Sequence, residues 1–279
     1  MNALAGKRVA VSLGASFMGY ATHAGFLARL TALGVRPVAL GGSSAGAIAA
    51  GLHGAGLSVE KIRDVVTGAA MPLSFIKRTR WGWQIFGDLT SRRQLAMFDA
   101  GGAVPFFEQL VGTRQIEDLR DPRVLIAMTD LQAQGAVFAK DGPLALAMAA
   151  SCTVPLTFAQ LEWKGRLVCD GGVVHEAPID PWFGDDSIDM IVVHRVMQEA
   201  RPRPWFIPSR IIHTLSEAHH CTNNQWLADR MALARFHGKE LLVASTTTCR
   251  PSIWSRRSRE SCYAAGEAGA QTFMESLSS

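Results

Sequence analysis

The first fifty residues contain the feature that most constrains the fold, a strand–helix–strand pattern. Two short runs rich in β-branched residues, 8–13 and 35–41, each end in or just before a glycine, as buried strands do. Between them, apolar residues recur about once per helical turn from Ala24 to Leu33, and Gly34 follows as a helix C-cap. A strand–helix–strand connection of this length makes the two strands parallel. The pattern therefore predicts an α/β fold built on a parallel sheet.

Strand and helix patterns alternate along the rest of the chain. A small-residue helix is expected after residue 44, and Ser58 is a suitable N-cap for the next one. Further strands are expected at 123–131, 135–139, 165–172, 188–196 and 240–245, and helices at 143–151, at 208–236 and over the amphipathic C-terminal stretch. No repeat or low-complexity linker interrupts the pattern. We therefore predict a single α/β domain over residues 1–279.

Composition limits the classes of protein to which the chain can belong. A formal net charge of +4, with basic residues spread along the chain, does not favour a nucleic-acid binder. Five cysteines without a CxxC pair indicate neither a disulfide framework nor a zinc site, and the adjacent ligands His219, His220 and Cys221 rarely share one ion. No run of about 18 apolar residues and no signal peptide is found. We predict a soluble cytoplasmic protein with no metal and no other cofactor.

Two adjacent serines, Ser43 and Ser44, stand where the second strand is expected to end and a helix to begin. A nucleophile at such a sharp turn needs small residues two positions before and after it, because a side chain there would collide with the neighbouring strand or helix. Gly42 and Gly46 satisfy this for Ser44, whereas Ser43 is followed two positions later by Ala45. We predict that Ser44 is the nucleophile. A glycine-rich turn that binds phosphate or only allows close packing is the alternative.

Four ordered segments resemble the patatin-like phospholipases. "GASFMG" (14–19) lies where that family has a glycine-rich oxyanion motif, and "GGSSAG" (41–46) is similar to its early nucleophile elbow. Residues 127–158 look like its central strand, hairpin and helix, and "VCDGG" (168–172) looks like its Asp-Gly-Gly signature. The resemblance covers about 8–196. It implies a three-layer fold with a mainly parallel central sheet flanked by helices, completed by residues 197–279.

The resemblance also implies a Ser-Asp dyad. Asp170 would take the proton of Ser44 directly, as a carboxylate within hydrogen-bond reach can do. The backbone N–H groups implied for the oxyanion hole are those of Gly14, Ala15 and Ser16, with Ala45 as an addition. Gly171 and Gly172 would form the turn after Asp170. No metal or organic cofactor is implied.

Several nearby residues need a separate interpretation. Ala15 and Ser16 replace glycines usual in the family, and Met18 replaces an arginine, so we expect either a rebuilt loop or reduced activity. His175 and His23 are more typical of packing residues than of a triad, and Asp130 is expected to be structural or to support the base.

A basic and aromatic stretch at 75–93 is a candidate membrane contact. Trp and Phe suit a lipid interface, and Lys and Arg attract anionic headgroups. The alternative, held equal, is that the aromatics pack on the core while the charges are solvated. Residues 250–260 repeat the mixture of tryptophan and arginine.

The predicted function is therefore a phospholipase A-type lipid acyl hydrolase, a serine esterase that cleaves acyl ester bonds through Ser44 and Asp170. The expected partner is a lipid or ester substrate, with peripheral membrane contact and without nucleic acid. Two alternatives stay open. One is a carboxylesterase or acyltransferase on smaller esters, and the other is a catalytically weak lipid-binding or regulatory protein of the same fold.

Overall fold

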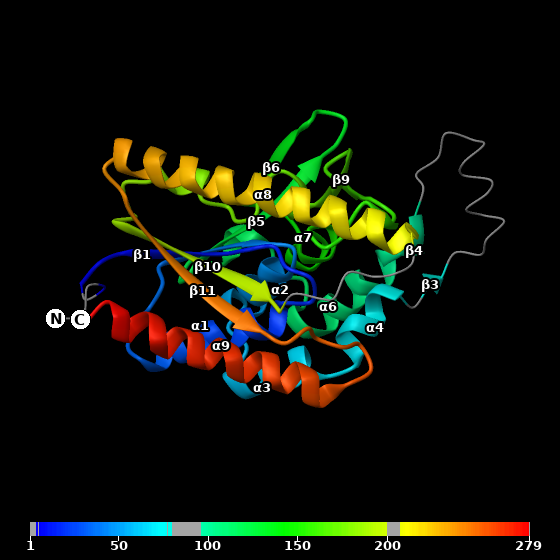
Figure 1. The fold of residues 1–279 in the computed structure, drawn as a ribbon, viewed down its shortest axis with the longest axis horizontal. Coiled ribbons are helices and arrows are strands. Elements are labelled where there is room, and N and C mark those ends of the chain that lie inside the picture. The colour runs from blue at the N-terminus through cyan, green and yellow to red at the C-terminus, as the bar shows by residue number, and fades with distance from the viewer. Residues whose placement is uncertain (1–3, 5, 77, 80–95, 200–206, 279) are drawn as a thin grey trace.

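A computed structural model describes residues 4, 6–76, 78–79, 96–199 and 207–278. Within these residues an eight-stranded sheet lies between two helical layers (Figure 1). Its strand order is β11 (Glu240–Thr248), β10 (Met190–Gln198), β1 (Val9–Leu13), β2 (Ala39–Ser43), β5 (Arg123–Asp130), β9 (Arg166–Asp170) and β8 (Leu161–Trp163), and β6 (Gly135–Ala139) also pairs with β5.

The five strands from β11 to β5 are parallel, and β6, β9 and β8 run antiparallel to their neighbours. Leu13 at the end of β1 is in register with His194 of β10 and Gly42 of β2. The carboxyl ends of these parallel strands therefore meet at one edge of the sheet, where ligand sites of α/β folds form.

The two faces of the sheet carry different helices because successive strand residues point to opposite sides. Val9, Val11 and Leu13 pack in one apolar cluster with residues of α1 (Tyr20–Ala32), α2 (Ala45–Gly54), α3 (Val59–Thr67) and α9 (Arg256–Ser276). Ala10 and Ile191 face the other cluster, which includes Leu227 and Ala234 of α8 (Ile207–Phe236). The predicted three-layer α/β fold is confirmed.

The smaller elements lie beside this core. A three-stranded sheet contains β3 (Arg78–Thr79), β4 (Ala96–Asp99) and β7 (Leu156–Phe158). Near it are α4 (Ala70–Ile76), α6 (Ala103–Val111) and α7 (Leu144–Ala150). Phe75 at the end of α4 is buried against Phe107. Most of the expected membrane contact at 75–93 lies outside the described residues.

One expectation from the sequence needs adjustment, and the structure answers one question that the sequence left open. Strand β2 begins at Ala39, four residues later than expected, because Pro37 has no N–H to donate to a neighbouring strand, and it extends to Ser43. The C-terminal part, whose topology the sequence left open, places β10 between β1 and β11 in the main sheet, while α9 packs against α1.

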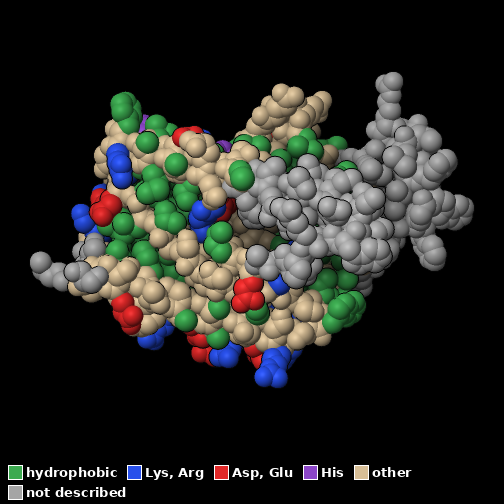
Figure 2. Space-filling view, viewed as in Figure 1, with side chains coloured by type: hydrophobic (Ala, Val, Ile, Leu, Met, Phe, Trp, Pro, Cys, Tyr) green, Lys and Arg blue, Asp and Glu red, His purple; other side chains and the backbone are tan. Residues whose placement is uncertain are grey.

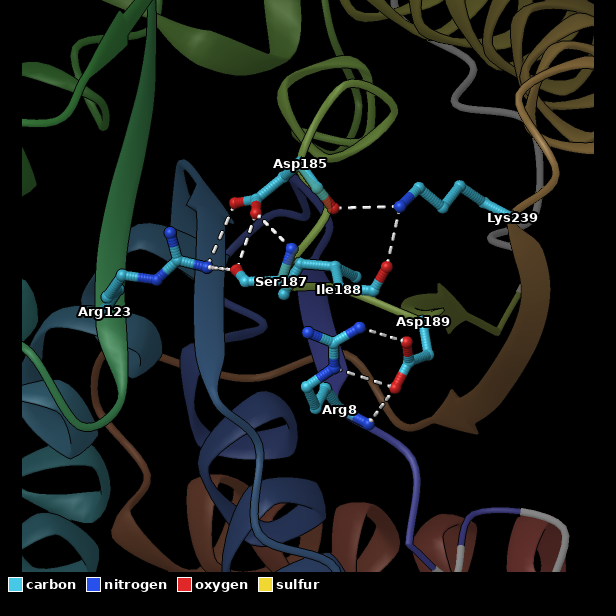
Figure 3. A network of polar contacts seen from close by, with 7 residues as sticks. All are labelled: Arg8, Arg123, Asp185, Ser187, Ile188, Asp189 and Lys239. Carbon is cyan, nitrogen blue, oxygen red and sulfur yellow. Dashed lines mark hydrogen bonds and ion pairs between the residues drawn. The ribbon is translucent and has the colours of Figure 1, made fainter.

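A polar network joins the amino ends of four strands, at the edge opposite Ser44 (Figure 3). Arg8 binds Asp189 through its backbone N–H and its guanidinium, at 2.5–3.0 Å. Arg123 contacts Ser187 and Asp185, and Lys239 donates to two carbonyl oxygens of the same turn. The turn before β10 thus holds the starts of β1, β5, β10 and β11.

Charges of both signs lie together over α9 and α3 in the space-filling view (Figure 2). Arg256 of α9, for example, lies between Asp64 of α3 and Glu260. Among the described helices none is both long enough and apolar enough to cross a bilayer.

Candidate active site

Ser44 lies between the end of β2 and the first residue of α2, at the carboxyl edge of the sheet. Its backbone has φ 52° and ψ −118°, a conformation that costs energy for a residue with a Cβ. The turn directs the chain from strand to helix within one residue. Such strain is typical of functional positions, where the required direction of a side chain is reached at a cost in backbone conformational energy.

Gly42 and Gly46 make this turn possible. A Cβ added to Gly42 would meet the carbonyl group of Gly46, and one on Gly46 would meet the carbonyl group of Leu13 in β1. Neither contact could be relieved by rotating a side chain, because both involve backbone atoms. The steric reason for expecting small residues on both sides of Ser44 therefore holds in the structure.

Asp170, the last residue of β9, faces Ser44. The Ser44 hydroxyl donates a hydrogen bond to Asp170 Oδ2 at 2.6 Å, and the Gly172 N–H donates to Oδ1 at 2.7 Å. The carboxyl group is buried, and this burial raises its pKa to about 6, although the two hydrogen bonds oppose the rise. At neutral pH the carboxylate is ionised, desolvated and aimed at the serine oxygen.

The turn is held by residues for which the sequence analysis proposed no role. The Ser44 N–H donates to Ser151 Oγ at 2.8 Å, and Ser151 in turn donates to the Ala127 carbonyl at 2.6 Å. The Cys152 thiol contacts the Ser44 carbonyl. Ser151 and Cys152 follow α7, and the Ala-Ser pair at the end of that helix was the signal available in the sequence.

The "GASFMG" loop runs from the end of β1 past Ser44 and Asp170. Gly14 donates its N–H to the His194 carbonyl at 3.0 Å, and Ala15 donates its N–H to the Glu176 carbonyl at 2.6 Å. Both groups expected in the oxyanion hole are therefore bound within the protein. The N–H groups of Ser16 and Ala45 have no such partner among the described residues. Of the four expected donors, these two could donate hydrogen bonds to a developing negative charge on a ligand.

The other sequence candidates lie around the hydrogen-bonded pair of Ser44 and Asp170 rather than in it. Ser43 donates its hydroxyl to the His175 carbonyl rather than to Asp170. The ring of His175 lies beside Asp180 and Trp226. Asp130 accepts the backbone N–H groups of the turn that follows β5, which is a structural role.

Two fully buried histidines lie behind the loop. Nδ1 of His23 is 2.9 Å from Nδ1 of His194, and His194 Nε2 is 2.9 Å from the Thr246 hydroxyl. Burial lowers the pKa of both rings, to about 3 for His23. Both are therefore neutral at physiological pH, so one Nδ1 donates and the other accepts.

The described residues contain no group of three or more His, Cys, Asp or Glu side chains placed to hold a metal ion. The side chains of His219 and His220 lie outside the described part of the chain.

Comparisons with known proteins identify the family of the chain. A family model described as patatin-like phospholipase matches residues 11–182, more than half of the chain. The chain belongs to the patatin-like phospholipase family. The patatin-like match includes Ser44, Asp170 and the loop, whereas β10, β11 and α9 lie beyond it.

Relatives and a solved structure extend the comparison. Three uncharacterised NTE family proteins, one from Mycobacterium bovis and two from Mycobacterium tuberculosis, are each 32% identical over 206 residues, which covers 70% of this chain and 51% of theirs. The chain thus spans about half the length of these curated relatives. The crystal structure of VipD from Legionella pneumophila is similar in fold, with a TM-score of 0.57 at 12% identity over 97% of this chain and 67% of that one.

Proposed function

We propose that this patatin-like chain is a lipid acyl hydrolase that cleaves acyl ester bonds with Ser44 as nucleophile and Asp170 as base. One observation carries the proposal: the 2.6 Å hydrogen bond from the Ser44 hydroxyl to a buried carboxylate. A serine hydroxyl becomes a useful nucleophile when a positioned base accepts its proton. The family membership supports lipid as the class of substrate.

The chemistry follows from the positions of these groups. Asp170 Oδ2 takes the Ser44 proton as Oγ attacks the ester carbonyl, and the protonated carboxyl then gives this proton to the departing alcohol. Asp170 then takes a proton from water as the water oxygen attacks the acyl-serine, and it returns this proton to Ser44 Oγ as the carboxylic acid leaves. The N–H groups of Ser16 and Ala45 would stabilise the oxyanion in both halves of the reaction. Ala45 is suited to this role because it is the first residue of α2, where partial positive charge gathers.

A second candidate is a lipid-binding protein with little turnover. It is favoured by the state of the loop, in which the N–H groups of Gly14 and Ala15 are already bound to carbonyl oxygens. Loss of one oxyanion donor typically costs about 10²–10³ in rate. Such a protein would retain lipid without hydrolysing it.

The decisive experiment is labelling with a fluorophosphonate probe, followed by peptide mass spectrometry. We expect the adduct on Ser44, its loss in Ser44→Ala and Asp170→Asn, and its retention in the matched control Ser43→Ala. Turnover is then compared between short soluble esters and phospholipid vesicles. Hydrolysis of the short esters alone would favour the smaller-ester alternative. Vesicle binding without label or turnover, on folded protein, would contradict the proposal and favour the lipid-binding protein.

A further inference from the structure

The "GASFMG" loop contains no charged residue, yet a buried ion pair lies directly against it. The side chains of Arg195 and Glu176 are 10% and 9% exposed, and Arg195 Nε donates to Glu176 Oε1 at 2.7 Å. Arg195 Nη2 also donates to Asn224 Oδ1 of α8 at 2.9 Å. A Cβ added to Gly14 would lie 3.7 Å from the Glu176 side chain. The Glu176 member of the pair thus packs against the first residue of the loop.

Glu176 connects this pair to the loop through its backbone. Its carbonyl accepts the Ala15 N–H at 2.6 Å, one residue before Ser16. The preceding carbonyl, that of His175, accepts the Ser43 hydroxyl, which is next to Ser44. Residues 175–176 therefore contact both parts of the chain that carry the remaining oxyanion donors, the loop and the serine turn.

The energetics suggest that the pair does more than stabilise the fold. Desolvation of a buried ion pair often cancels its Coulombic gain, so apolar side chains of similar volume can be equally stable there. Glu176 Oε2, in addition, is buried with no hydrogen-bond partner in the described chain. A costly and incompletely satisfied pair is better explained by the geometry that it imposes on the loop than by its contribution to stability.

We propose that Arg195 and Glu176 are positioning residues for the oxyanion hole. Arg195, on β10, holds Glu176, whose carbonyl holds Ala15, and this places the Ser16 N–H toward the acyl oxygen on Ser44. The proposal rests on the proposed function of Ser44 and Asp170. It assigns a part in that site to Arg195, which lies outside the segment that the family model matches.

The test compares four proteins: wild type, Arg195→Met, the double variant Glu176→Leu/Arg195→Met, and the control Arg230→Met. The control removes an arginine from another ion pair on the same side of the sheet, with Asp180, which does not contact the loop. Three quantities are measured: the melting temperature, amide hydrogen exchange of the peptide containing residues 14–19, and kcat and KM on a short soluble ester.

We expect Arg195→Met to speed exchange in the loop at least tenfold and to lower kcat about 10–100-fold, with little change in KM, because an oxyanion donor acts in the transition state. The acid limb of the rate profile, which reports Asp170, should not move. The double variant, in which no buried charge lacks a partner, should recover the melting temperature but not kcat. The control should match wild type in exchange and kcat.

Two results would overturn the proposal: wild-type exchange and kcat in Arg195→Met, or recovery of kcat together with the melting temperature in the double variant. A purely structural pair would give the second result. If wild-type protein shows neither turnover nor label, the proposed function fails and the catalytic part of this inference fails with it. Amide hydrogen exchange of the loop still reports whether the Arg195–Glu176 pair holds Ala15. Failure of the proposed function and failure of this inference can therefore be distinguished.

Discussion

Charged side chains at the two edges of the parallel sheet differ in burial and in pairing. At the amino edge, Arg8 and Asp189 form a paired, partly exposed contact, and Lys239 is satisfied by carbonyl oxygens (Figure 3). At the carboxyl edge, Asp170 and Glu176 are buried, and Glu176 Oε2 has no partner among the described residues. Hydrogen bonds from Arg8 hold the pKa of Asp189 well below its usual range, whereas burial raises the pKa of Asp170 to about 6.

This difference indicates that the amino edge of the sheet contributes to stability, whereas the carboxyl edge is suited to a functional site. Charged groups that are fully paired near solvent connect strand ends at modest cost, and their individual contributions are small. Buried and partly unsatisfied polar groups reduce stability, and they persist where a ligand or a reaction uses them. We therefore expect equivalent substitutions at the two edges to have different consequences.

The largest contrast is expected between two Asp→Asn substitutions. Asp170→Asn removes the proposed base and should lower the rate of ester hydrolysis about 10²–10⁴-fold. Asp189→Asn removes a surface ion-pair partner on the opposite edge and should leave the rate unchanged. Steady-state kinetics on one soluble ester measures both variants.

The stability of Asp170→Asn should not follow its activity. Because the pKa of Asp170 is higher folded than unfolded, its stabilising contribution is fully present below pH about 4 and is lost as the pH rises through about 6. At pH 8, Asp170→Asn should therefore melt no lower than wild type. A clear fall in melting temperature at that pH would mean that ionised Asp170 supports the fold, and the proposed separation of roles would be wrong.

A second contrast compares two glycines. Gly46→Ala places a Cβ against the Leu13 backbone at the carboxyl edge and should cost at least about 2 kcal/mol of unfolding free energy. Gly184→Ala, close to the amino-edge turn, meets no described atom within 4 Å and should be tolerated. Urea denaturation measures both. Equal stabilities would show that α2 can move away from β1 at little cost.

The last contrast concerns pH. Because the proposed base Asp170 could act only when ionised, kcat/KM should fall about tenfold per pH unit below pH about 6, with the slope of a single ionisation. His23, with a pKa of about 3, stays neutral across this window. The pH–rate profile from pH 4 to 9 provides the measurement. An acid limb that disappears in His175→Gln would assign the ionisation to a histidine and contradict the dyad.

Parts of the molecule followed from local sequence alone. Strand β1, helix α1 and the Gly34 turn were predictable because hydrophobic periodicity and a positive φ are decided within a few residues. The Ser58 cap of α3 and the β5–β6 hairpin were predictable for the same reason. The need for Gly42 and Gly46 followed from the shape of a single turn.

Other parts depended on contacts between residues far apart in the chain. Ser44 and Asp170 are separated by 126 residues, and their pairing was expected only from the family resemblance. The N–H groups of Gly14 and Ala15 donate to the carbonyl oxygens of residues 194 and 176, which no local pattern identifies. Ser151, which accepts the Ser44 N–H, and the ion pair of Arg195 with Glu176 were missed for the same reason.

The sequence by itself therefore determined the parallel strand–helix–strand start, several of the later elements, the sharp serine turn and the family, since these depend on short-range sterics, periodicity and motif spacing. The tertiary structure alone decided the strand order that places β10 beside β1, and with it which N–H groups of the loop stay available. Backbone donors and acceptors are the same in every residue, so their partners are selected by strand register and packing rather than by side-chain identity.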